Sequence, residues 1–345
     1  MTPPPTNVEL PGPRVYLVAI VLLATMIGSL EAALRMRGFV PTVADSAHLW
    51  AYHRSRVVGD DAGLVVAIGT SRARTDLRPD AMHECLPSHR FVQLGINGAA
   101  SPLDLLAEIS RIPHFRGLVL CDLLPPLMDR NQRSEQSSFV RVPSDNVQAP
   151  SAYLQGLLSE RLAVLDPALT LRRCVTAQGV LRPKPDGPQL RVHADRTLDI
   201  TYASPESLKT STELRQLYYA DLYAKLKRYK SIEEFKQAVA SVADSVARIQ
   251  RNGGQVVFLR LPAAGARLEL EESTFLSTPY FSALADVTSA PWIDFRNLAG
   301  KEAFDCPDES HLSLNGARAF TTRLVDDLRR RGLLIEPGDS QPTRR

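Results

Sequence analysis

One stretch of sequence, LVVAIGTSRARTD (residues 64–76), combines a strand pattern with a candidate functional residue. Five apolar residues run without a break from Leu64 to Ile68, as is typical of a strand buried on both faces of a parallel sheet. Gly-Thr-Ser follows directly and charged residues come next, which places Ser71 at the end of that strand. A serine in this position either closes a tight turn or is displayed as a nucleophile at the sheet edge.

The rest of the chain alternates apolar runs with amphipathic segments. Further apolar runs occur at 91–94, 117–124, 255–261 and 292–295. The segment 231–251 has helical spacing, with one apolar face made of Phe235, Val239, Val242, Val246 and Ile249. Strands that alternate with helices predict an α/β fold, which we expect to be a flavodoxin-like three-layer sandwich around a central, mostly parallel five-stranded sheet.

The N-terminal region predicts a membrane anchor. Residues 1–14 are rich in proline and expected to be disordered, and the apolar stretch 15–34 is long enough as a helix to cross a hydrocarbon core. A cleaved signal peptide and a buried helix of a soluble domain are the alternatives, but the residues that follow make a poor cleavage site. We therefore expect an uncleaved transmembrane helix.

The charges that flank this helix do not fix the side of the membrane on which the body lies. Arginines follow the helix at positions 35, 37, 54 and 56. By the positive-inside rule they favour a cytoplasmic body. Long domains are translocated despite such charges, so an extracytoplasmic body stays open.

The composition is that of an ordinary folded protein. Of 345 residues, 44% are apolar and 23% are charged, and the net charge is +3. No basic face with interleaved aromatic residues is present, so we expect no nucleic-acid partner. The cysteines lack the C-x-x-C spacing of zinc or redox sites, and no histidine spacing points to a metal or another cofactor; the cysteines are Cys85, Cys121, Cys174 and Cys306.

These patterns predict an α/β domain that is interrupted by a long insertion. The domain itself is expected at 61–128 and 253–333, and a mostly helical insertion at 129–252 separates the two parts. A helical neck at 35–60 links the domain to the anchor. The last residues, 334–345, are expected to form a disordered polar tail.

Three loops at the carboxyl ends of the expected strands carry polar residues of the types used in nucleophilic catalysis. Ser71 follows the first strand, Asn97 and Gly98 follow the second, and Asp308 and His311 follow the last. Ligands of open parallel sheets bind beyond the carboxyl ends of the strands. Because these loops open on the same edge, we expect the serine, histidine and aspartate to meet there.

This set of residues predicts a nucleophilic triad. A serine hydroxyl needs an adjacent base to act as a nucleophile at neutral pH, and His311 fits that role. Asp308, three residues earlier, can accept the other imidazole N–H and stabilise the imidazolium. The backbone N–H groups of Ser71 and Gly98 are candidate donors to the oxyanion of an acyl-transfer reaction.

The same blocks resemble those of the SGNH (GDSL-type) hydrolase superfamily. GTSR at 69–72 is similar to its first block, INGA at 96–99 to its second and DESH at 308–311 to its last. The resemblance implies that Ser71 is the nucleophile, that Gly98 is an oxyanion donor, and that Asp308 and His311 complete the triad. It covers about residues 29–121 and 253–333, and the insertion resembles no family known to us.

A membrane-anchored branch of that superfamily is the most similar. The anchor and neck, together with GGQVVFLRLP (253–262) and ESHLSLNGARAFT (309–321), resemble bacterial proteins of alginate O-acetylation and D-alanyl transfer. This implies hydrolysis or transfer of an acyl ester on a small molecule, carbohydrate or polymer of the cell envelope. It also implies a periplasmic body at the inner membrane and a membrane acyl-donor protein as a partner.

The sequence departs from the family pattern near the expected oxyanion site. Thr70 stands where the family usually has Asp, and the third strand ends with Asp122 where an Asn side chain is expected to donate to the oxyanion. An ionised carboxylate would repel an oxyanion, so Asn97 is the candidate substitute. Arg72 and Arg260 either contact an anionic substrate group or pair with local acids. A non-catalytic scaffold with this fold is therefore the alternative to an enzyme.

Overall fold

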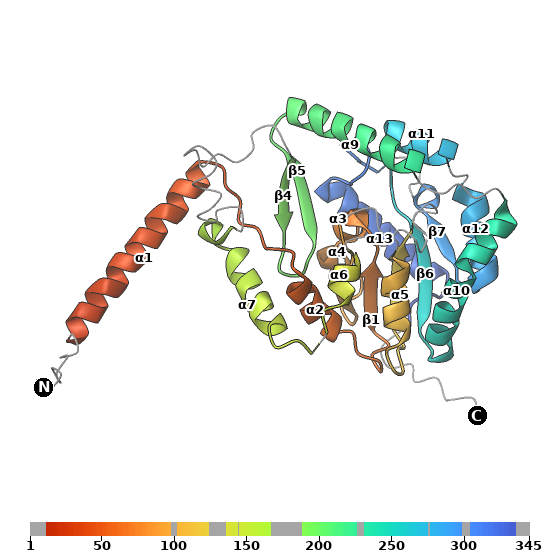
Figure 1. Ribbon diagram of the computed structural model, residues 1–345, viewed down its shortest axis with the longest axis horizontal. Helices are drawn as coiled ribbons and strands as arrows, with labels where there is room; N and C mark the ends of the chain where they lie inside the picture. The colour runs from red at the N-terminus through yellow and green to blue at the C-terminus, as the bar shows by residue number, and fades with distance from the viewer. Residues whose placement is uncertain are drawn as a thin grey trace, which may run out of the picture.

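A five-stranded parallel sheet forms the centre of the protein, as predicted (Figure 1). The computed structural model describes residues 12–97, 102–123, 136–143, 145–166, 188–225, 231–274, 277–298 and 304–335. In the order β2-β1-β3-β6-β7, all neighbouring strands are parallel. The strands are β1 (Leu64–Ile68), β2 (Arg90–Gln93), β3 (Leu118–Asp122), β6 (Gln255–Arg260) and β7 (Trp292–Asp294).

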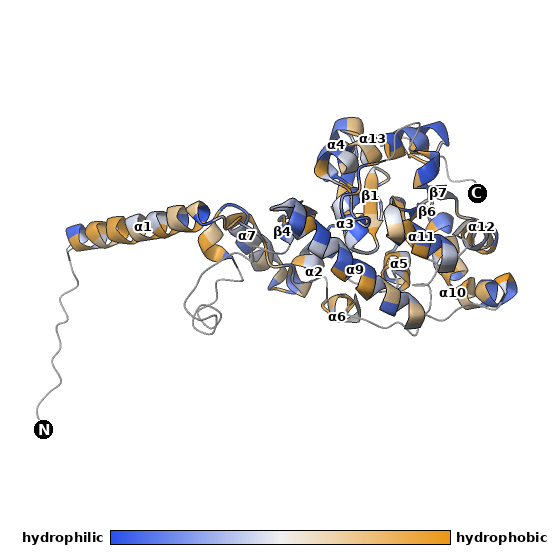
Figure 2. Cartoon of the chain, turned by 90° about the horizontal axis from the view of Figure 1, so that it is seen from above, coloured by the Kyte–Doolittle hydropathy of each residue, from blue (hydrophilic) through white to orange (hydrophobic). Residues whose placement is uncertain are grey.

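Helices cover both faces of this sheet and make it a three-layer sandwich. Figure 2 shows α4 and α13 on one side of β1, with α5, α10 and α12 on the other. The first side comprises α3 (Ser71–Asp76), α4 (Pro79–Cys85) and α13 (Leu314–Arg330). The second comprises α2 (Ala47–Ser55), α5 (Leu103–Ser110), α6 (Gln136–Val140), α10 (Ile232–Arg251) and α12 (Ser277–Thr288).

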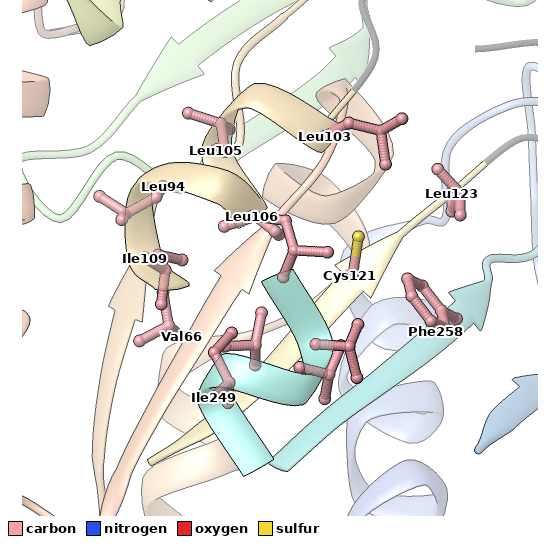
Figure 3. Packing of buried hydrophobic residues seen from close by; sticks show 14 of the residues in the cluster. Val66, Leu94, Leu103, Leu105, Leu106, Ile109, Cys121, Leu123, Ile249 and Phe258 are labelled. Atoms are coloured by element: carbon pink, nitrogen blue, oxygen red, sulfur yellow. The ribbon is translucent and has the colours of Figure 1, made fainter. Parts of the chain in front are cut away.

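Strand residues alternate between the two apolar layers because successive side chains of a strand point to opposite faces. Val65 and Ala67 pack beneath α13, whereas Val66 and Ile68 pack against α5 and α10. Figure 3 shows the second layer, in which Val66, Cys121 and Phe258 of the sheet lie close to apolar side chains of the covering helices. Burying each such aliphatic side chain contributes about 1.5–3 kcal/mol, so the sheet provides a rigid platform for its loops.

The strand order reverses beside β1. The chain passes from β1 to β2 on one side and then returns to β3 on the other, so the connections that leave β1 and β3 diverge. In α/β sheets a ligand site forms outside the carboxyl ends of the strands at such a reversal. Ser71 directly follows this end of β1, and Asp122 ends β3.

The range 129–252, expected to be a mostly helical insertion, contains both helices and an antiparallel hairpin. The hairpin was not expected, and it consists of β4 (Pro188–Val192) and β5 (Leu198–Tyr202). The helices α7 (Ala149–Ser159) and α9 (Pro205–Lys225) lie outside the central sandwich (Figure 1), as does the short helix η2 (Ala163–Leu165). In contrast, α10 buries its apolar face in the core beside β6, with the five residues that share one face in the sequence pattern.

Two short helices follow the last two strands of the sheet. The helix α11 (Gly265–Thr274) follows β6 and packs against α9, and η4 (Phe295–Asn297) follows β7. Figure 1 shows α9 and α11 beside each other at the edge of the sheet where α3 begins. The expected neck, 35–60, contains α2, whose Leu49, Trp50 and Ala51 are buried in the body.

One helix of the described chain, α1 (Pro13–Met36), is long and apolar enough to cross a membrane. Its most apolar 18-residue window has a mean hydropathy of 2.2, and only 6% of that window is buried against the rest of the protein. Figure 2 shows α1 projecting from the body with a largely apolar surface. Length and composition alone support a membrane-spanning role.

Candidate active site

Ser71 is the first residue of α3 and is held in place by the turn that follows β1. Thr70 caps the helix, because its hydroxyl accepts a hydrogen bond from the backbone N–H of Arg72 at 3.3 Å. The carboxylate of Asp122, at the end of β3, accepts hydrogen bonds from the backbone N–H and the hydroxyl of Thr70 at 3.2 and 2.7 Å. The half-buried Ser71 side chain is therefore fixed at the sheet edge by contacts from two neighbouring strands.

His311 brings the distant C-terminal loop to this serine. Its Nε2 lies 3.0 Å from Ser71 Oγ, although the two residues are 240 positions apart, and its Nδ1 lies 3.0 Å from Asp308 Oδ2. An ionised carboxylate only accepts hydrogen bonds, so Nδ1 carries the hydrogen and Nε2 is free to accept from the serine hydroxyl. The sequence-predicted Ser71, His311 and Asp308 are thus brought together in hydrogen-bonding order.

The other carboxylate oxygen of Asp308 is bound by backbone N–H groups. Oδ1 accepts hydrogen bonds from the backbone N–H groups of Ser310 and His311 at 3.0 and 2.7 Å. This local turn explains the Asp-x-x-His spacing, because a carboxylate that caps its own turn faces the imidazole three residues later. The loop is docked to α3 through Asp76, whose Oδ1 accepts from the backbone N–H of Leu312 at 3.1 Å.

Two further residues contact Asp308, and both come from the long segment between β3 and β6. The phenol of Tyr202, at the end of β5, donates a hydrogen bond to Oδ2. The guanidinium of Arg215 on α9 forms an ion pair with the same oxygen, with an Nε–Oδ2 distance of 3.2 Å. Sequence reasoning missed both, because neither lies in a recognisable motif. The alternating pattern LDITY (198–202) is the signal that could have found the strand carrying Tyr202.

The environment lowers the pKa of both titratable groups. Burial tends to raise the pKa of Asp308, but the hydrogen bond from His311 and the charges of His311 and Arg215 outweigh it, so the pKa falls well below its usual value. Burial lowers the pKa of His311 below 6.5, and Arg215 adds to this effect, while Asp308 opposes it. At neutral pH the site therefore holds an ionised aspartate and a neutral imidazole, which is the form of a general base.

Replacing Arg215 by glutamine is expected to move the acidic limb of the pH–rate profile to higher pH. Removing this cation raises the pKa of His311, so the imidazole becomes protonated, and inactive as a base, at a higher pH than in the wild type. The measurement is kcat/KM against pH for the hydrolysis of a small activated ester, the kind of reaction that the sequence predicts. Arg215→Lys keeps the charge and serves as the control. An acidic limb that stays in place in Arg215→Gln would contradict the predicted coupling.

The structure describes some of the candidate oxyanion donors and not others. The loop after β2 lies beside the turn of Ser71, since the backbone N–H of Ile96 donates to the Gly69 carbonyl at 2.9 Å. Gly98 lies outside the described residues. Asn97 follows Ile96, and its buried Oδ1 has no partner among the described residues. The roles of Ser71, Gly98 and Asn97 in binding an oxyanion stay predictions.

Arg72 and Arg260 belong to a buried ion-pair cluster. Arg72 Nη1 lies 3.3 Å from Glu271 Oε1, and Arg260 Nη1 lies 3.2 Å from Asp294 Oδ2. Arg267 joins the cluster with its Nε 2.8 Å from Glu271 Oε1. Both predicted arginines are at most 2% exposed, so the geometry gives them a structural role. Their contact with a substrate stays a prediction.

Within the described part of the chain, two pockets reach the candidate triad residues. One, with a volume of about 370 Å³, opens beside His311 and is bounded by α3, the hairpin and the loop before α13. Its lining includes Thr75, Arg78, Leu198, Tyr202, Leu312 and Leu314. The other, with a volume of about 210 Å³, reaches Asp308 and Ser310 from α9 and α11. The first is within the size range of small-molecule sites and lies next to the candidate base.

Comparison with known proteins adds little to this geometry. No protein-family model matches the chain, and no curated protein matches it either. A crystal structure of TesA aligns with 77% of this chain and 98% of its own, at 12% identity and a TM-score of 0.35. A second crystal structure aligns with 80% of this chain and 99% of its own, at 11% identity and a TM-score of 0.37. Neither likeness is close enough to indicate an activity.

Proposed function

We propose that the protein is a serine-dependent acyl-ester hydrolase or O-acyltransferase that uses Ser71, His311 and Asp308. One observation carries the proposal: Ser71 Oγ lies 3.0 Å from His311 Nε2, and His311 Nδ1 lies 3.0 Å from Asp308 Oδ2. These distances are in the hydrogen-bonding range required of a nucleophile, its base and the group that orients the base. The neutral imidazole and the ionised carboxylate support the same assignment.

In the first half of the reaction, Ser71 Oγ attacks the carbonyl carbon of the ester. His311 Nε2 takes the hydroxyl proton, and Asp308 stabilises the imidazolium without itself becoming protonated. The tetrahedral intermediate carries its negative charge on the former carbonyl oxygen, close to the N-terminus of α3, where the Ser71 N–H is the candidate donor. Collapse breaks the ester C–O bond, and His311 gives its proton to the leaving alkoxide, which departs as an alcohol.

In the second half, the acyl group leaves Ser71. Water or a carbohydrate hydroxyl loses its proton to His311 Nε2 and attacks the acyl carbon, and the proton then returns to Ser71 Oγ as the bond to serine breaks. Water gives hydrolysis, and a hydroxyl gives transfer. The pocket beside His311 offers room for the acceptor.

The location of the reaction is part of the proposal. The apolar helix α1 supports a single-pass anchor. Together with the resemblance to envelope-modifying proteins, it favours a periplasmic body at the inner membrane, a carbohydrate or polymer of the envelope as substrate, and a membrane protein as acyl donor. An alkaline phosphatase reporter fused at the C-terminus tests sidedness, because it is active only if the body is extracytoplasmic.

A fluorophosphonate probe is expected to label the wild-type protein and not Ser71→Ala. The probe reacts with a serine only when a neighbouring base activates it, and the hydrogen bond to His311 provides that activation. Labelling is read from gel fluorescence and located by mass spectrometry. Ser88→Ala, a substitution at a serine outside the site, is the control and should label normally. A folded wild type that resists the probe would contradict the proposal.

A non-catalytic scaffold is the second candidate, and Asp122 favours it. Its carboxylate is fully buried at the end of β3, where a donor to the oxyanion was expected, and its Oδ1 has no partner among the described residues. Losing one oxyanion donor costs about two to three orders of magnitude in rate. Full function of Ser71→Ala in the native host would favour the scaffold over the enzyme.

A further inference from the structure

The helix α7 carries its leucines on the outside. Gly156, Ser159 and Ala149 are buried against the body, whereas Leu154 and Leu158 are 60% and 57% exposed. This reverses the usual arrangement of a surface helix, in which the apolar stripe faces the core. Further exposed apolar residues lie before, within and after the helix: Val147, Leu157 and Leu165. We call this set, with Leu154 and Leu158, the α7 apolar face.

Ring stacking fixes which side of α7 faces the body. The ring of Tyr153 stacks on Tyr52 of α2, with centroids 4.1 Å apart and an angle of 11° between the rings. Val43 and Ala194 lie within 4 Å of the position that a side chain at Gly156 would occupy. The small residues of α7 therefore allow close approach to the body, so rotating the helix to bury its leucines would break these contacts.

The segment that follows α7 is tied to the C-terminal end of α1. Glu31 accepts hydrogen bonds from the backbone N–H groups of Ala163 and Val164 at 3.0 and 2.9 Å. Arg35 donates to the carbonyl of Arg161 at 2.6 Å. Figure 1 accordingly shows one end of α7 near the C-terminal end of α1, and η2 contacts both helices. The α7 apolar face is thus held close to the end of the apolar helix.

We propose that the α7 apolar face docks on the lipid surface beside α1. The inference rests on the proposed membrane anchoring of α1 and does not depend on the catalytic proposal. A helix of 24 residues is about 36 Å long, about 6 Å more than a hydrocarbon core of about 30 Å, so its last turn reaches the interface. Arg35 lies in that turn and Glu31 one turn earlier, and their contacts hold the segment directly after α7, which begins within three residues of Leu158, beside this end of α1.

The chemistry of the surrounding side chains fits an interfacial position. Leucines on one face of a helix enter the boundary between headgroups and acyl chains, and arginines keep their charge in the headgroup layer. Arg161 is exposed at the end of α7, and Arg37 directly follows α1. Docking through two elements would hold the body in one orientation, whereas a single helix would leave it free to tilt.

Tryptophan fluorescence in vesicles tests this docking. The full chain is reconstituted into vesicles of phosphatidylcholine and phosphatidylglycerol, with or without brominated acyl chains, which quench a tryptophan that touches them. Leu158→Trp and, as a second reporter, Leu154→Trp are expected to lose their added emission in brominated vesicles. The wild type, with Trp50 and Trp292, provides the background to be subtracted.

Two matched leucines make the result decisive. Leu22→Trp, within α1, reports on the anchor itself, and Leu217→Trp on α9, where the leucine is 70% exposed, reports on nonspecific adsorption. Quenching at positions 22, 154 and 158 but not at 217 supports the proposal. Quenching at 22 alone overturns the docking and leaves the anchor intact. Equal quenching at 158 and 217 overturns it as adsorption, and no quenching at 22 overturns both the anchor and the docking.

Discussion

Replacing Asp308 by asparagine is expected to lower kcat by about four orders of magnitude with little change in fold. The carboxylate accepts from His311 Nδ1 and thereby leaves Nε2 unprotonated, facing Ser71. An asparagine amide in its place can donate to Nδ1, which would put the hydrogen on Nε2 and leave His311 unable to take the serine proton. It would also remove the charge that stabilises the imidazolium.

The measurement is the rate of hydrolysis of a small activated ester at pH 7.5. Asp305→Asn makes the same chemical change at an exposed position in the same loop and should retain wild-type activity. Thermal unfolding followed by circular dichroism shows whether each variant is folded. An Asp308→Asn enzyme as active as the wild type would exclude the triad, while the fold and the anchor would be unaffected.

Replacing Gly69 by alanine is expected to destabilise the protein by roughly 2–5 kcal/mol and to abolish activity. Gly69 has a φ of +143°, a conformation that side-chain-bearing residues rarely adopt. A Cβ atom there would lie 2.5 Å from Asp122 Cβ and 3.1 Å from its backbone oxygen. Relieving this overlap would separate the ends of β1 and β3, and with them the turn that positions Ser71.

Urea denaturation of the full chain in detergent gives the loss in the free energy of unfolding. Gly28→Ala, in the middle of α1, is the matched control, since a Cβ there meets nothing within 4 Å. It should not lower the stability, because alanine favours a helix over glycine, and it should leave the activity unchanged. If Gly69→Ala were as stable as the wild type, the close packing of the turn against β3 would be wrong.

The sandwich could be predicted from the sequence because its strands are continuous apolar runs. Runs such as 64–68 and 256–259 are apolar throughout, and each lies between segments with helical spacing, which is the pattern of a buried parallel sheet. The hairpin at 188–202 was missed. Its first strand begins at a proline and both strands are short and only half-buried, so the apolar signal is weak.

The meeting of Ser71, Asp308 and His311 could be predicted because these residues lie directly after a strand or in a compact turn. Once a parallel sheet is assumed, Ser71, Asp308 and His311 fall on one edge. The residues that support Asp308 could not be found in this way. Tyr202 and Arg215 reach it only because the hairpin and α9 dock over the loop, and a tertiary contact of that kind leaves no local pattern in the sequence. Arg72 and Arg260 likewise look accessible in the sequence but are buried among acids.

The separation of β3 from β6 along the chain has a consequence for biosynthesis. These strands are neighbours in the sheet, yet the whole segment with the hairpin, α7, α9 and α10 is synthesised between them. While the nascent polypeptide grows, β3 has an open edge of unpaired backbone groups, which invites association with other chains. The growing chain should therefore need a chaperone until β6 has been synthesised, and truncation before residue 255 should yield aggregated material.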